Sequence, residues 1–72
     1  MKINIVNHIE DKIKEYQNRT GATKTWIAKK MGYNSIQAFD KAMKNNSNSL
    51  ETYAKFALFL NCDVTDLFRI NQ

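Results

Sequence analysis

The sequence predicts one all-α domain. The chain has 72 residues, no proline and only two glycines, so most of it is free of residues that break helices. Hydrophobic residues make up 43% of the chain, which places it among sequences that fold around a core rather than among disordered ones. A chain this short forms a single core. We therefore expect residues 1–72 to form one domain of five short helices.

A first helix is predicted from about Asn4 to Arg19. Apolar side chains recur there at the three- and four-residue spacing of an amphipathic helix, namely Ile5, Ile9, Ile13 and Tyr16. Gly21 follows shortly after, and glycine commonly supplies the left-handed residue that ends a helix.

Two further helices are predicted to meet at a tight turn. Thr23 can cap the second helix, and Gly32 ends it. The apolar residues of this helix are Ile27, Ala28 and Met31. The third helix begins at Asn34 or Ser35 and gathers Ile36, Phe39, Ala42 and Met43 on its inner side. Its outward side then carries Asn34, Gln37, Lys41 and Lys44, with Asp40 beside them.

A polar loop at residues 44–49 precedes a fourth helix, which Asn48 or Ser49 can cap. Asn61 can end this helix in the left-handed conformation. Its apolar stripe is predicted to contain Leu50, Tyr53, Ala54, Ala57, Leu58 and Leu60. A fifth short helix is predicted after Asp63, with Asp66 as capping partner, and its apolar residues Leu67, Phe68 and Ile70 would cover the core.

Several classes of protein are disfavoured. One cysteine, Cys62, and one histidine, His8, allow neither an internal disulfide nor a structural zinc site. No constellation of nucleophile, base and carboxylate is evident, so we expect no enzyme and no cofactor. The chain lacks a signal peptide and an apolar run of about 20 residues, which favours a cytoplasmic protein without a membrane partner.

The charge balance favours a polyanionic partner. Eleven Lys and Arg residues against seven Asp and Glu residues give a net charge of +4 and a pI near 9.4. Many small basic proteins bind no nucleic acid, so the placement of the charges matters more than their sum. Five lysines fall on the second and third helices, which raises the odds of DNA binding.

The pair of helices joined after Ile27-Ala28-Lys29-Lys30-Met31-Gly32 resembles the helix-turn-helix of Cro and phage-repressor proteins, the XRE family. Residues 49–68 are similar to the last two helices of that family, and the resemblance spans nearly the whole chain. One departure concerns the third helix, because the family's inward position holds Ala38 here and Phe39 comes one residue later. The turn Gly32-Tyr33-Asn34-Ser35 locally resembles AraC-type regulators, which leaves the register of this helix open by one residue.

The resemblance implies that residues 23–45 bind double-stranded DNA, with the third helix in the major groove and the second helix across the phosphates. Gln37 is the best candidate to read a base, since its amide can bind adenine through two hydrogen bonds. The other candidates for base contacts are Asn34, Ser35 and Lys41. The candidates for phosphate contacts are Thr23, Lys24, Thr25, Lys29, Lys30, Tyr33 and Lys44.

Several aromatic residues have more than one possible role. Trp26 can pack in the core, lie against the DNA backbone or join a partner surface, and Tyr33 can bind phosphate or cover the turn. A surface for a dimer or another partner can include Phe56, Phe59, Phe68 and Ile70, although these residues can equally complete the core.

The favoured function is that of a sequence-specific transcriptional regulator, a repressor acting as a homodimer on an inverted repeat without a small-molecule substrate. The alternative is a protein-interaction module on the same fold, such as an antirepressor or an inhibitor of a host factor, for which Asp40 beside the reading face is the best support. An architectural DNA-bending role is disfavoured because no wedge residues lie near a basic arm.

Overall fold

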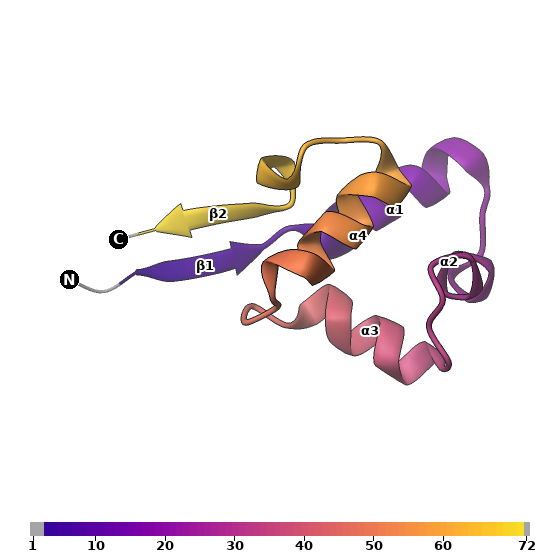
Figure 1. The fold of residues 1–72 in the computed structure, drawn as a ribbon. Coiled ribbons are helices and arrows are strands. Elements are labelled where there is room, and N and C mark those ends of the chain that lie inside the picture. The colour runs from indigo at the N-terminus through magenta and orange to yellow at the C-terminus, as the bar shows by residue number, and fades with distance from the viewer. Residues whose placement is uncertain (1–2, 72) are drawn as a thin grey trace.

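The structure is a computed structural model and describes residues 3–71. These residues form four α-helices, one turn of 3-10 helix and a two-stranded antiparallel sheet (Figure 1). The prediction of an all-α domain with five helices is therefore wrong. Figure 1 shows the sheet at one end of the molecule and α2 at the opposite end.

The helices are α1 (Ile9–Thr20), α2 (Lys24–Lys30), α3 (Ile36–Lys44) and α4 (Leu50–Leu60). The strands are β1 (Asn4–Asn7) and β2 (Phe68–Asn71), and the 3-10 turn η1 spans Val64–Asp66. None of the helices within residues 3–71 is long and apolar enough to cross a lipid bilayer.

Side-chain caps set the beginnings of three helices, as predicted. The hydroxyl of Thr23 accepts a hydrogen bond from the backbone N–H of Trp26 at 3.1 Å. Ser35 and Ser49 cap α3 and α4 in the same way. Left-handed residues follow the ends of α1 and α4, since φ is 75° at Gly21 and 56° at Asn61.

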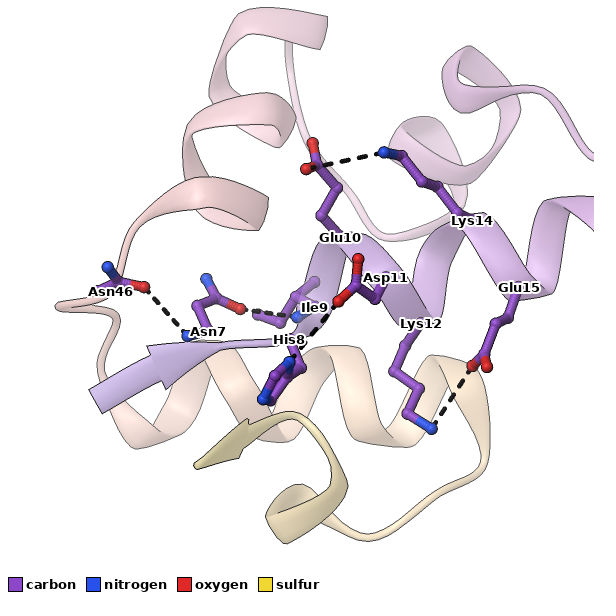
Figure 2. A network of polar contacts seen from close by, with 9 residues as sticks. All are labelled: Asn7, His8, Ile9, Glu10, Asp11, Lys12, Lys14, Glu15 and Asn46. Carbon is purple, nitrogen blue, oxygen red and sulfur yellow. Dashed lines mark hydrogen bonds and ion pairs between the residues drawn. The ribbon is translucent and has the colours of Figure 1, made fainter. Parts of the chain in front are cut away.

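The predicted start of the first helix is wrong, because residues 4–7 form a strand. The helix begins at Ile9, whose backbone N–H donates to Asn7 Oδ1 at 2.8 Å (Figure 2). The Asn7 amide also donates to the Asn45 carbonyl at 2.8 Å, and its backbone N–H donates to Asn46 Oδ1 at 3.1 Å. These bonds tie β1 to the loop between α3 and α4.

The predicted fifth helix is also wrong. The Asp66 carboxylate does accept a hydrogen bond from the backbone N–H of Asp63, at 3.3 Å, but the helix stops after one turn at η1. Leu67 is fully buried, and the chain then continues as β2. β2 pairs with β1 in an antiparallel register that places Asn71 opposite Asn4 and Phe68 opposite Asn7.

Two phenylalanines lie in the centre of the core. Phe39 and Phe56 are both fully buried, and their ring centroids lie 5.8 Å apart. The other fully buried side chains are Ile9, Ile13, Ile27 and Leu67. The core therefore joins all four helices to the segment that leads into β2.

The predicted stripe of α4 is wrong in part. Tyr53, Phe56 and Ala57 are buried, whereas Leu50 is 67% exposed and Leu58 is 85% exposed. Ala54 is exposed as well. The helix is thus rotated so that Phe56, rather than Leu58, faces the core.

Candidate nucleic-acid interface

The turn between α2 and α3 is held by backbone hydrogen bonds. Gly32 has a φ of 87°, a conformation that L side chains rarely adopt. Its N–H donates to the Lys29 carbonyl at 3.1 Å, and the N–H of Tyr33 donates to the Ala28 carbonyl at 2.9 Å. The ring of Tyr33 also packs edge-on against Phe39 at a centroid distance of 5.5 Å. These contacts fix the direction in which α3 leaves the turn.

The structure assigns Phe39 as the inward residue of α3. Phe39 is fully buried and Met43 is 2% exposed, whereas Ala38 is exposed. The register that the sequence left open is therefore the one with the longer turn. On the opposite side of the helix, Gln37, Lys41 and Lys44 are exposed, and Asn34 is exposed in the turn before the helix. Amide and ammonium groups thus line one continuous outer face of α3.

The net charge of the protein is concentrated on this pair of helices. Residues 23–45 hold five lysines and one acidic residue, Asp40, a balance of +4, whereas the rest of the chain holds six basic and six acidic residues. Among residues 3–71, four of the five lysines are exposed without an ion-pair partner, namely Lys29, Lys30, Lys41 and Lys44. By contrast, Lys12 and Lys14 on α1 pair with Glu15 and Glu10 (Figure 2).

The fifth lysine, Lys24, has a partner within the protein. Its Nζ lies 2.9 Å from Asp40 Oδ1, so the pair joins the start of α2 to the middle of α3. The Oδ1 atom is itself buried and accepts no hydrogen bond of good geometry, so the Lys24 ammonium is its charge compensation. Lys24 is therefore already engaged, unlike the other lysines of the predicted phosphate set. The negative charge of Asp40 beside the outer face of α3 is neutralised.

The remaining residues of the predicted interface lie in different environments. Thr23 and Ser35 are exposed and serve as helix caps, and Thr25 is exposed on α2. Tyr33 covers the turn with its ring, and burial raises the pKa of its hydroxyl above the ordinary value. Trp26 is 45% exposed, because one side of its ring lies near Phe59 while the Lys30 ammonium lies 5.5 Å from the ring centroid.

The predicted dimer or partner surface needs correction. Phe56 is fully buried and cannot contact another molecule, and Phe59 and Phe68 are partly buried against the core. Ile70 alone of the predicted set is an exposed large hydrophobic residue, at 58%. The sequence reasoning missed Ile3, Ile5 and Leu50, which are 60%, 40% and 67% exposed. The alternation Ile3-Asn4-Ile5 covers three residues only, which is too short to predict a strand.

Cys62 follows the end of α4 by two residues and is partly buried. Burial, and then the negative charge of Asp66, raises the pKa of its thiol above the ordinary value. No group of three His, Cys, Asp or Glu residues in the described part of the chain could hold a metal ion.

No family model, curated protein or solved structure matches the chain.

Proposed function

We propose that the protein is a sequence-specific DNA-binding regulator of transcription, a repressor that acts as a homodimer on an inverted repeat. One observation carries the proposal. The whole net charge of +4 falls on residues 23–45, where α3 presents the Gln37 amide and two lysines that have no ion-pair partner among residues 3–71 on a single outer face. Concentrated positive charge together with base-reading amides is the combination expected of a protein that reads a DNA groove.

In this proposal α3 enters the major groove. Gln37 lies one residue inside the helix and is exposed, so its amide can bind an adenine edge, and Asn34, exposed in the turn before the helix, offers a second amide. Lys41 can reach a guanine or a phosphate, and Lys44 lies at the end of the helix nearer the neighbouring phosphates. Occupation of the operator would exclude polymerase, which makes repression the direct consequence of binding.

The phosphate contacts come from α2 and from the end of α3. Lys29 and Lys30 are exposed in the last turn of α2 and have no ion-pair partner among the described residues. Because neither lysine is in such an ion pair, binding DNA breaks none. Lys24 is a weaker candidate because a phosphate would have to compete with Asp40.

The experiment that tests the proposal is the selection of bound sequences from a random duplex pool at two salt concentrations. An inverted repeat enriched at both concentrations supports a dimeric regulator that reads sequence. Binding without any enriched motif, or no binding, contradicts the proposal.

Replacing Gln37 and Lys41 is expected to have different effects on DNA binding. Gln37→Ala should relax base preference at one position by about 1–3 kcal/mol, because only a base-edge contact is lost. Lys41→Ala should weaken binding to all sequences alike and lower the salt slope by about one, if the lysine contacts phosphate. Fluorescence anisotropy on the selected duplex and its single-base variants measures both effects. If Gln37→Ala lowered the affinity for selected and random duplexes equally, Gln37 would not be a base-reading residue.

Asp40→Asn is expected to strengthen DNA binding. The substitution removes the one negative charge of residues 23–45 and releases Lys24 for a phosphate. One more phosphate contact steepens the dependence of log affinity on log salt by about 0.9 per copy. The matched control is Glu51→Gln, which removes one negative charge at the start of α4 and outside this pair of helices. An unchanged salt slope for Asp40→Asn would show that Lys24 does not reach DNA.

A protein-interaction module remains the second candidate, favoured by the half-exposed Trp26 and by Leu58, which is 85% exposed beside Lys30 and Lys55. Affinity for a protein through such apolar contacts would respond little to salt, whereas DNA affinity falls steeply.

A further inference from the structure

A groove of about 310 Å³ lies between the end of α2 and the second half of α4, and we call it the basic groove. It is lined by Lys30, Met31, Lys55, Leu58 and Phe59. Leu58 is 85% exposed, more than any other large hydrophobic residue within residues 3–71. It lies beside two partly buried apolar side chains, those of Met31 and Phe59. The groove therefore presents a continuous apolar surface rather than one isolated exposed leucine.

The apolar surface continues from the basic groove onto Trp26. The ring centroid of Trp26 lies 6.5 Å from that of Phe59, and Trp26 is 45% exposed. The Lys30 ammonium lies 5.5 Å from the same ring, within the range of a cation–π contact. This contact favours one position for the ammonium, at the end of the groove that borders Trp26.

The charge of the basic groove is positive only. Lys30 and Lys55 are exposed, and neither has an ion-pair partner among residues 3–71. No acidic residue lines the groove. The one acidic residue of α4, Glu51, lies a turn before Lys55 and forms no ion pair with it. The groove thus offers an apolar floor with two free ammonium groups beside it.

We propose that the basic groove binds a short acidic segment of another protein. A bulky apolar side chain of that segment contacts Leu58, Met31 and Phe59, and carboxylates on either side of it pair with Lys30 and Lys55. The inference goes beyond DNA binding and does not rest on it, because Lys55 and Leu58 lie outside residues 23–45.

The charge and the exposed leucine together select this occupant. A second copy of the chain would bring its own Lys30 and Lys55 against the same two residues, and like charges oppose such a contact. A nucleic acid would pair its phosphates with the lysines but would leave the aliphatic side chain of Leu58 without an apolar partner. An acidic segment with an apolar residue satisfies both kinds of group.

The affinity of such a segment is expected to be modest. One apolar side chain and two ion pairs bury far less than the roughly 800 Å² per partner of a standard interface. Ion pairs at an exposed surface also contribute little each. We therefore expect a dissociation constant in the micromolar range.

The test is fluorescence anisotropy of a fluorescein-labelled peptide titrated with the whole chain, without DNA. The peptide carries a leucine-phenylalanine pair between two runs of glutamate. Two comparison peptides separate the two kinds of contact, one with alanines in place of the apolar pair and one with lysines in place of the glutamates. Each comparison peptide is expected to bind at least about ten-fold more weakly.

Two variants of the protein locate the binding site. Leu58→Ala removes the apolar contact, and Lys55→Glu reverses one charge of the groove. Each is expected to raise the dissociation constant of the glutamate peptide at least about ten-fold. Circular dichroism checks that the variants stay folded, which is expected because both side chains are exposed.

Each variant has a matched control outside the basic groove. Leu50→Ala makes the same change on the same helix at a residue that is 67% exposed. Lys44→Glu makes the same change of net charge at an exposed lysine on α3. Both controls should bind the glutamate peptide nearly as the wild type does, because only contacts within the groove are specific.

Four results would overturn the inference. They are no binding of the glutamate peptide at micromolar concentrations, equal binding of the alanine peptide, unchanged binding by Leu58→Ala, and an equal loss for Lys44→Glu and Lys55→Glu. The last result would show attraction to the net charge of the protein rather than to the groove. Since no DNA is present, failure to select a DNA motif would leave these measurements unaffected.

Discussion

Phe56→Ala is expected to destabilise the domain by about 3–5 kcal/mol, because it removes a fully buried ring that contacts Phe39 and Tyr33. A folded chain of this size has a free energy of unfolding of only about 4–11 kcal/mol. The substitution therefore removes a large share of the stability. Urea denaturation followed by circular dichroism measures the loss.

The control for Phe56→Ala is Leu58→Ala, two residues later on the same helix. Leu58 is 85% exposed, so we expect a change within about 0.5 kcal/mol. The comparison also tests the rotation of α4. A greater loss of stability for Leu58→Ala than for Phe56→Ala would show that Leu58, and not Phe56, faces the core.

DNA affinity is expected to fall by about 10³–10⁵ between roughly 50 and 200 mM salt, if two copies together neutralise 6–10 phosphates. Each copy has four exposed lysines without an ion-pair partner on α2 and α3. Neutralised phosphates release condensed cations, and this release is less favourable as salt rises. Anisotropy titrations of the selected duplex over a salt series give the slope.

Single substitutions show how much each lysine contributes to this salt dependence. Lys29→Gln is expected to lower its magnitude by about 0.9 per copy. Lys14→Gln is the matched control, because Lys14 lies on α1 and pairs with Glu10. A slope that responds to Lys14 and not to Lys29 would contradict the proposed interface.

Sequence reasoning predicted the parts of the fold whose signals are local. Thr23, Ser35 and Ser49 cap helices through hydroxyls within their own first turns, and Gly21 and Asn61 end helices by their own backbone conformation. The prediction of the core face of α3 was also correct, because the apolar residues of that helix form a single stripe. These features depend on residues at most a few positions apart.

The two strands could not be predicted, because their pairing depends on residues far apart in the sequence. Ile5 and Ile9 have the four-residue spacing of a helix face, but Ile5 belongs to β1 and only Ile9 to α1. The partner of β1 is β2, at the other end of the chain, and no hairpin turn marks that pairing. In α4, apolar residues lie almost all round the helix, so periodicity could not choose between Phe56 and Leu58.

The candidate interface was predictable in composition but not in its internal contacts. The outer face of α3 follows from helical spacing, with Phe39 as the inward residue. The pair between Lys24 and Asp40 could not be predicted, because it depends on the angle at which α2 and α3 meet. The same holds for the hollow that Ile5 and Leu50 line together, since Leu50 reaches Ile5 only through the tertiary packing of α4.

The pairing of β1 with β2 has a consequence for the order of folding. Asn4 lies opposite Asn71, so the sheet closes a loop that contains every helix, whereas α1 to α4 rest on shorter-range contacts. Loop-closure entropy favours the short-range contacts first, and the sheet is then the last element to form. The two ends of the chain can therefore separate by local opening of the sheet while the four helices stay folded.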